Sequence, residues 1–207
     1  MTHRSASNNL VSVAILAGGE SRRMGQNKAL LPVHGKPLIA WMVERVQALT
    51  PYITVVARDP SIYSFLPVPV VTDMYPGIGP LAGLHVALQT AVAPWVIVLA
   101  CDMPLVDPRV LSHLLSLREG VDVVMPRLHG REEPLHAVYR KETCVPAVEK
   151  AIAQGQRRLI SFLPYVRVRY VEEEELRALD PELLSFRNAN TPEEWEALQV
   201  YLQRSHT

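Results

Sequence analysis

The sequence has few cysteines, no excess of charge of either sign and no long apolar run. Its only cysteines are Cys101 and Cys144, and no C-x-x-C pair occurs, which argues against a disulfide framework and favours a reducing, cytoplasmic setting. Lysine plus arginine number 21, as do aspartate plus glutamate, so the chain lacks the basic excess of a nucleic-acid-binding protein. The longest apolar run, residues 95–101, is too short to span a membrane.

The sequence also lacks internal repeats and a low-complexity linker. Residues 1–9 are polar, without the apolar segment of a secretion signal, and we expect them to form a flexible terminus. A chain of 207 residues that is 48% hydrophobic and 20% charged is typical of a globular domain with a substantial core. We therefore expect residues 1–207 to form a single domain.

Apolar runs alternate with amphipathic segments along the whole chain. Strands are predicted at residues 11–17, 53–57, 68–72, 95–100, 121–125, 134–139 and 167–171. Helices are predicted at residues 37–49, 79–91, 108–118 and 144–154, and from Thr191 onward. The run at 95–100 is continuously apolar, as expected of a central parallel strand covered on both faces. The alternation predicts an α/β fold, a three-layer α/β/α sandwich with a mostly parallel, Rossmann-like sheet.

The segment that follows the first predicted strand carries the clearest chemical signal. It contains three glycines and three cationic residues, Gly18, Gly19, Gly25, Arg22, Arg23 and Lys28. Glycines let backbone N–H groups come close to a ligand, and arginine and lysine supply donors that suit phosphate oxygens. The spacing matches neither a P-loop nor the Rossmann fingerprint. We interpret it as a polyphosphate-binding loop; an ordinary glycine-rich turn with solvated arginines is the alternative.

The same segment resembles the opening of the molybdenum-cofactor guanylyltransferases, the MobA family within the nucleotidyltransferase group. The matching residues are Leu16, Ala17, Gly18, Gly19, Arg23, Met24, Gly25, Lys28, Gly35, Pro37 and Leu38. The resemblance implies nucleotide contacts at Leu16, Ala17, Gly18, Gly19, Gly25 and Lys28, with the base received by the main chain of the first three. One departure is Asn27, where the family usually has aspartate; asparagine can orient the loop by hydrogen bonds but carries no charge.

Two aspartates follow predicted strands, where ligands of such sheets bind. Asp102 comes directly after residues 95–100, and a buried carboxylate there needs a partner such as Mg²⁺. Its segment resembles the one whose aspartate holds magnesium in the family; a turn aspartate ahead of Pro104 is the alternative. Asp73 precedes a segment, 79–83, that also matches the family, which implies a nucleotide contact. Its alternative is an aspartate that caps a turn.

The acceptor side of the site is less clearly marked. His136 lies in a segment, residues 134–139, that the family places near the pterin phosphate, although a lone histidine is more often structural. Arg157, Asn188 and Asn190 are candidates to complete that pocket. Arg157 can equally belong to a solvated surface, and Asn190 to the entry of the last helix.

The resemblance implies that GMP is transferred from GTP to the terminal phosphate of molybdenum-molybdopterin, releasing pyrophosphate and forming the guanine dinucleotide cofactor. Lys28, Arg23 and Asp102 would be the catalytic residues and Mg²⁺ the cofactor, held by Asp102. Proteins that deliver molybdopterin, and molybdoenzymes that receive the product, are further expected partners. Two alternatives stay open. One is a CTP-dependent transferase, although those relatives more often have Ala-Ala-Gly where Gly18 and Gly19 stand; the other is a nucleotide-binding module without catalysis.

Overall fold

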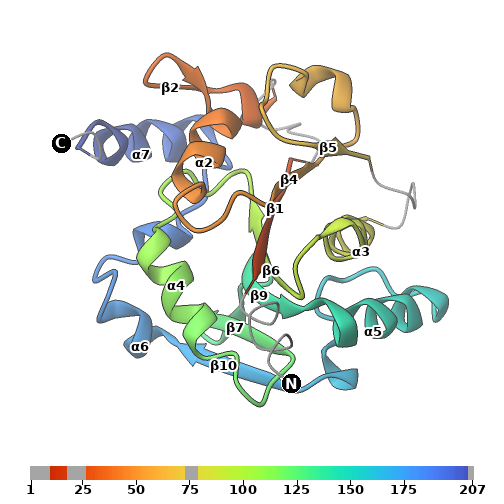
Figure 1. Ribbon diagram of the computed structural model, residues 1–207. Helices are drawn as coiled ribbons and strands as arrows, with labels where there is room; N and C mark the ends of the chain where they lie inside the picture. Colours follow the sequence, from red (N-terminus) through yellow and green to blue (C-terminus); the bar gives the residue numbers. More distant parts are fainter. Residues whose placement is uncertain (1–9, 18–26, 73–78, 205–207) are drawn as a thin grey trace, which may run out of the picture.

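The computed structural model describes residues 10–17, 27–72 and 79–204. In these residues an eight-stranded sheet lies between two layers of helices (Figure 1). The strand order is β10-β7-β9-β6-β1-β4-β5, with β8 paired to β7. This arrangement confirms the predicted three-layer α/β/α sandwich.

The main sheet is formed by β1 (Val11–Leu16), β4 (Ile53–Val56), β5 (Val70–Val71), β6 (Trp95–Ala100), β7 (Val123–Leu128), β8 (Arg131–Glu132), β9 (His136–Arg140) and β10 (Val168–Glu172). A separate hairpin pairs β2 (Pro32–Val33) with β3 (Lys36–Pro37). The α-helices are α2 (Leu38–Val46), α3 (Pro80–Thr90), α4 (Pro108–Ser116), α5 (Lys141–Ala153), α6 (Glu173–Arg177) and α7 (Pro192–Arg204). Short 3₁₀-helices are η1 (Lys28–Leu30), η2 (Pro60–Tyr63), η3 (Leu163–Tyr165) and η4 (Leu184–Phe186).

The direction of β9 determines which segments meet at the functional edge of the sheet. β1 runs parallel to β4 and β6, so the carboxyl ends of these strands lie together. β9 is antiparallel to both β6 and β7, with His136 paired to Leu99 near the end of β6. The start of β9, rather than its end, therefore lies at the carboxyl edge of β6.

The two faces of the sheet pack against different helices. Side chains alternate along β1, so that Val13 and Ile15 belong to one buried cluster and Ala14 and Leu16 to the other. Helices α2, α4, α6 and α7 cover the first face, and α3 and α5 cover the second (Figure 1). The sheet is thus buried on both faces, as the continuously apolar sequence of β6 predicts.

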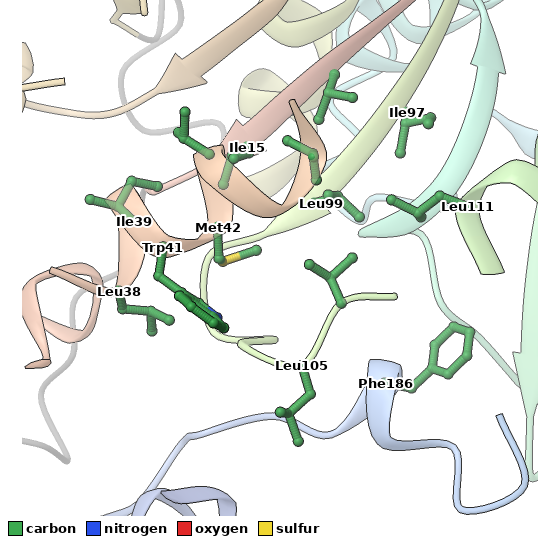
Figure 2. Packing of buried hydrophobic residues seen from close by; sticks show 14 of the residues in the cluster. Ile15, Leu38, Ile39, Trp41, Met42, Ile97, Leu99, Leu105, Leu111 and Phe186 are labelled. Atoms are coloured by element: carbon green, nitrogen blue, oxygen red, sulfur yellow. The ribbon is translucent and has the colours of Figure 1, made fainter. Parts of the chain in front are cut away.

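Helix α2 fixes the segment that follows β6. Figure 2 shows Trp41 and Met42 of α2 packed toward the loop that carries Leu105. The indole N–H of Trp41 donates to the Pro104 carbonyl at 3.1 Å, and Arg45 Nε donates to the Val106 carbonyl at 2.8 Å. The segment just after Asp102 is therefore anchored to the core rather than free to move.

Several element boundaries differ from the predictions. The strand predicted at 68–72 shortens to β5, because this edge strand has only β4 beside it. Helix α5 begins at Lys141 rather than at 144, because β9 leads directly into it. The predicted helix at 37–49 spans only α2, and the hairpin β2–β3 was not predicted.

Both cysteines are free thiols, as predicted. Cys144 is fully buried, and Cys101 is partly buried. Burial raises the pKa of each thiol to about 12, so neither is poised as a thiolate near neutral pH. No helix in the described parts of the chain combines the length and apolar character needed to cross a membrane.

Asp122 joins the start of β7 to the segment before β10. Its carboxylate accepts hydrogen bonds from the backbone N–H of Arg167 at 2.9 Å and from its Nε at 3.1 Å. Burial alone would raise the pKa of Asp122, but these contacts outweigh burial and lower it below the ordinary value. Because its pKa is lower in the folded state, the ionised Asp122 carboxylate stabilises the fold at pH values above its unfolded-state pKa of about 4. This stabilisation is lost as the pH falls through the native pKa.

We expect Asp122→Asn to lower the free energy of unfolding at pH 7 by about 1 kcal/mol, since it weakens charged hydrogen bonds. The difference from the wild type should shrink as the pH falls, because the wild-type carboxylate becomes protonated as the pH approaches its lowered native pKa. Urea unfolding at pH 7 and at about pH 2.5 measures both differences. An equal difference at the two pH values would contradict this role for the charge of Asp122.

Candidate active site

Lys28 opens the short helix η1, and Asn27 caps it. The side-chain oxygen of Asn27 accepts from the backbone N–H of Ala29 at 3.1 Å, and its amide nitrogen donates to the Tyr63 hydroxyl at 2.9 Å. The Tyr63 hydroxyl in turn lies 3.5 Å from the carbonyl of Ala17, at the end of β1. Asn27 therefore orients this part of the chain by hydrogen bonds, as predicted, and it uses a donor that aspartate lacks.

Asp102 lies where β6 ends beside β1. Leu16 is paired with Ala100, and the backbone N–H of Cys101 donates to the Leu16 carbonyl at 3.1 Å. The Asp102 side chain is 25% exposed. Burial raises the pKa of Asp102 more than the nearby Lys28 ammonium lowers it. Within the described residues, the charge of Lys28 therefore does not fully offset the burial of this carboxylate.

Three distant segments converge at this point. Lys28 Nζ donates to the side-chain oxygen of Asn190 at 2.7 Å and lies 3.9 Å from Asp102 Oδ2. The backbone N–H of Ala189 donates to the Asp102 carbonyl at 2.9 Å. The predicted residues Lys28 and Asp102 are therefore neighbours, and Asn190, predicted on the acceptor side, joins them directly.

Two further carboxylates act on this group and were not singled out from the sequence. Burial and the charge of Asp102 raise the pKa of Glu133, which precedes β9. Glu194, in the first turn of α7, also raises the pKa of Asp102 by its charge. The antiparallel direction of β9 brings Glu133 here, and a sequence pattern that predicts strands without their direction does not reveal this.

His136 lies at the start of β9, opposite Leu99 near the end of β6. It is fully buried, and its ring lies 4.4 Å from the ring of Phe186, centroid to centroid. Neither ring nitrogen has a hydrogen-bond partner among the described residues, and burial lowers the pKa of His136 to about 3. His136 is therefore a neutral group of the core, and the structure does not bring it to Lys28 and Asp102.

The other candidate acceptor residues are exposed. Asn188 lies in the segment before α7, two positions from Asn190. Arg157 follows α5, which runs antiparallel to α3, because Lys141 at its start bonds carbonyls at the end of α3. Arg157 thus follows the end of α5 that lies toward the start of α3, at the carboxyl edge of the sheet, and no hydrogen bond or ion pair joins it to Lys28. The remaining predicted site residues, Gly18, Gly19, Arg23, Gly25 and Asp73, lie outside the described residues.

A hollow of about 530 Å³ lies on the face covered by α2, α4 and α7, and it does not include Lys28 or Asp102. Its charged groups already have partners within the protein. Arg109 pairs with Asp107 at 2.7 Å, and the Tyr201 hydroxyl lies 3.2 Å from Glu182. We therefore place the site at the carboxyl ends of β1 and β6 rather than in this hollow.

The side chains around Asp102 determine which kind of divalent-cation site this edge of the sheet can form. No cluster of three or more histidine, cysteine, aspartate or glutamate side chains occurs among residues 10–17, 27–72 and 79–204. A protein cage for a structural metal is therefore not formed by these residues. Mg²⁺ bound through one or two carboxylates, with phosphate and water oxygens as its other ligands, is compatible with Asp102.

Comparisons with known proteins identify the family of this chain. The family described as "MobA-like NTP transferase domain" matches residues 13–170. A protein of Pelotomaculum thermopropionicum named "Probable molybdenum cofactor guanylyltransferase" is 39% identical over 194 residues, covering 93% of this chain and 94% of its own length. The "Molybdenum cofactor guanylyltransferase" of Desulfosudis oleivorans is 34% identical, with 93% of this chain and 96% of its own length covered.

A solved structure is similar in fold as well as in sequence. The crystal structure of molybdopterin-guanine dinucleotide biosynthesis protein A from Archaeoglobus fulgidus superposes with a TM-score of 0.81 at 34% identity. The alignment covers 94% of this chain and 100% of that one. On the match over residues 13–170 and on relatives above 30% identity along nearly the whole chain, the protein belongs to the family of MobA-like NTP transferase domains.

Proposed function

We infer that this protein is a molybdenum cofactor guanylyltransferase. It transfers GMP from GTP to the terminal phosphate of molybdenum-molybdopterin, releasing pyrophosphate and forming the guanine dinucleotide cofactor. The observation that carries this conclusion is the agreement of curated relatives at 34–39% identity over more than 90% of the chain. The neighbouring Lys28 and Asp102 at the carboxyl edge of the sheet support it, because both groups suit a polyphosphate substrate.

The reaction needs positioning and charge stabilisation more than proton transfer. The attacking phosphate oxygen of the acceptor is already ionised at neutral pH, so no general base is required. The oxygen attacks the α-phosphorus of GTP in line, a new P–O bond forms, and the bond to pyrophosphate breaks. In our proposal Lys28, together with Arg23, offsets the negative charge that grows on the α-phosphate and the leaving pyrophosphate.

The nucleotide would lie across the ends of β1 and β6. We propose that the main chain of Leu16, Ala17 and Gly18 receives the base, and that Gly19 and Gly25 bring backbone N–H groups to the phosphates. We assign a further nucleotide contact to Asp73. The carbonyl of Ala17 is close to the Asn27–Tyr63 pair, so this pair would orient the base-binding backbone.

Asp102 is the residue we propose as the Mg²⁺ ligand. Burial raises the pKa of Asp102 more than Lys28, at 3.9 Å, lowers it, so a bound cation would offset the cost of burying this carboxylate. Bound Mg²⁺ would add Lewis-acid stabilisation to phosphate oxygens.

The acceptor would approach from the side of Arg157 and Asn188, whose exposed side chains can meet a phosphate. His136 would support this region by packing, since its ring is buried. Molybdopterin-delivering proteins and recipient molybdoenzymes are the partners that this activity would require. The two free thiols fit the reducing cytoplasm, where we place the reaction.

We expect the protein to bind Mg-GTP at least about 10-fold more tightly than Mg-CTP or Mg-ATP. Calorimetric titration with each nucleotide measures this preference, and chromatography of a reaction with molybdenum-molybdopterin then detects the guanine dinucleotide. Tighter binding of Mg-CTP would reassign the protein as a cytidylyltransferase with the same phosphate chemistry. Binding of Mg-GTP without any dinucleotide product would instead indicate a nucleotide-binding module.

A further inference from the structure

The side chain of Lys28 is hydrogen-bonded to a neutral amide although a carboxylate lies nearby. Its ammonium donates to Asn190 Oδ1 at 2.7 Å but stands 3.9 Å from Asp102 Oδ2, beyond hydrogen-bond distance. The Lys28 and Asp102 side chains are only 15% and 25% exposed, so their attraction is weakly screened by solvent. Lys28 and Asp102 thus form a long ion pair without a hydrogen bond, and the hydrogen bond of Lys28 goes to the amide of Asn190 instead.

A direct ion pair would be harmful to a site that must bind a metal and a polyphosphate. With the ammonium seated on Asp102, the carboxylate would be neutralised by the protein itself, and Mg²⁺ would have to displace Lys28. The same contact would withdraw Lys28 from the phosphates. A neutral acceptor such as Asn190 holds the ammonium in place and does not neutralise its charge as a carboxylate would. It takes one of the three N–H donors of Lys28, so the other two can donate to phosphate oxygens.

Asn190 is itself held firmly by the start of α7. Its backbone N–H donates to Glu194 Oε2 at 2.7 Å, and the backbone N–H of Thr191 donates to the same oxygen at 3.2 Å. The backbone N–H of Glu194 donates back to Thr191 Oγ1 at 3.2 Å, which completes a capping box. The adjacent Ala189 bonds the Asp102 carbonyl, so one short segment contacts both Lys28 and Asp102.

We propose that Asn190 is a positioning residue that keeps the Lys28 ammonium apart from Asp102, so that the lysine serves the phosphates and the aspartate serves the cation. This role differs from direct contact with the acceptor, for which Asn190 was a candidate from the sequence. The inference rests on the proposed function, since it concerns the binding of Mg-GTP at the same site.

The test measures Mg-GTP binding without acceptor, at several Mg²⁺ concentrations, by calorimetry. We expect Asn190→Ala to weaken GTP binding about 10-fold and to raise the Mg²⁺ concentration needed for half-maximal binding about 5-fold. Glu196→Ala is the matched control, because Glu196 is exposed on α7, the helix that follows Asn190, and no hydrogen bond or ion pair joins it to Lys28. Asn190→Ser, whose hydroxyl is too short to reach Lys28, should repeat the loss and serves if the alanine variant folds poorly.

A double-mutant cycle with Lys28→Ala separates positioning from other roles. If Asn190 acts through Lys28, Asn190→Ala should cause no further loss of GTP binding in the Lys28→Ala background. A loss of equal size in both backgrounds would overturn the proposal and indicate direct contact with metal or nucleotide. Unchanged GTP and Mg²⁺ binding in Asn190→Ala, with weaker binding of the acceptor alone, would overturn it in favour of an acceptor contact.

The cycle also distinguishes failure of this inference from failure of the proposed function. If the wild type binds no Mg-GTP, or if Lys28→Ala binds it as tightly as the wild type, the assignment of the nucleotide site fails, and the inference fails with it. If Lys28→Ala weakens binding while Asn190→Ala does not, only the inference fails.

Discussion

Replacing Asp102 by alanine should reduce the turnover of GTP by at least about 100-fold, the scale of losing one electrostatic stabiliser in a transition state. The reason is that Asp102 is the carboxylate at the junction of β1 and β6, where the cation and the phosphates would meet. Burial raises its pKa, so its negative charge is a cost to the folded state rather than a support. The variant should therefore unfold at or above the wild-type temperature.

Two further variants sharpen the test of Asp102. Asp102→Asn keeps the shape of the side chain and should lose nearly as much turnover, because the cation requires the charge. Glu119→Gln removes an exposed carboxylate beyond α4 and should leave turnover unchanged. Release of pyrophosphate from Mg-GTP and acceptor gives the turnover, and a thermal melt verifies folding. If the turnover of Asp102→Asn stays within a few-fold of the wild-type value, Asp102 is not a metal ligand in the reaction.

Lys28→Ala should lower turnover by at least about 100-fold and should also weaken the binding of Mg-GTP. Lys28 supplies a cation that is mostly buried and held by Asn190 beside the proposed phosphate site. A second effect follows from its neighbour, because removal of the ammonium leaves Asp102 without the positive charge that lowers its pKa. The pH below which turnover falls should accordingly move upward in this variant.

Lys36→Ala is the matched control for Lys28→Ala. Lys36 lies on β3 and pairs with Glu44 at the surface, at 2.7 Å, so its removal should change neither turnover nor GTP binding. Turnover and its pH profile are measured for both variants and the wild type. Equal losses in the two variants would mean that general positive charge, rather than the position of Lys28, attracts the nucleotide.

The layers of this fold could be predicted from periodicity. The apolar run of β6 and the helical spacing in α3 and α4 identify these elements almost to the residue, because each is buried on the faces that its pattern implies. The edge strand β5 and the hairpin β2–β3 were harder to predict, because their pairing depends on neighbours that a local pattern does not contain.

The candidate site could be predicted in part. Lys28 and Asp102 stood out because one follows glycines and the other ends a buried strand. The bond between Lys28 and Asn190 joins residues 162 positions apart, and no local pattern encodes it. His136 packs against Phe186 of η4, a contact between distant parts of the sequence, so the local pattern left both the structural and the acceptor-binding interpretation of His136 open.

Asn190 follows the last strand of the sheet in the sequence, and this order affects the stage of folding at which the enzyme becomes active. Every strand of the main sheet precedes residue 173, whereas the partner of Lys28 is residue 190, so pairing of the sheet does not by itself hold the lysine. We expect a refolding chain to form its sheet before the segment ahead of α7 docks on Lys28, which separates acquisition of the fold from acquisition of activity.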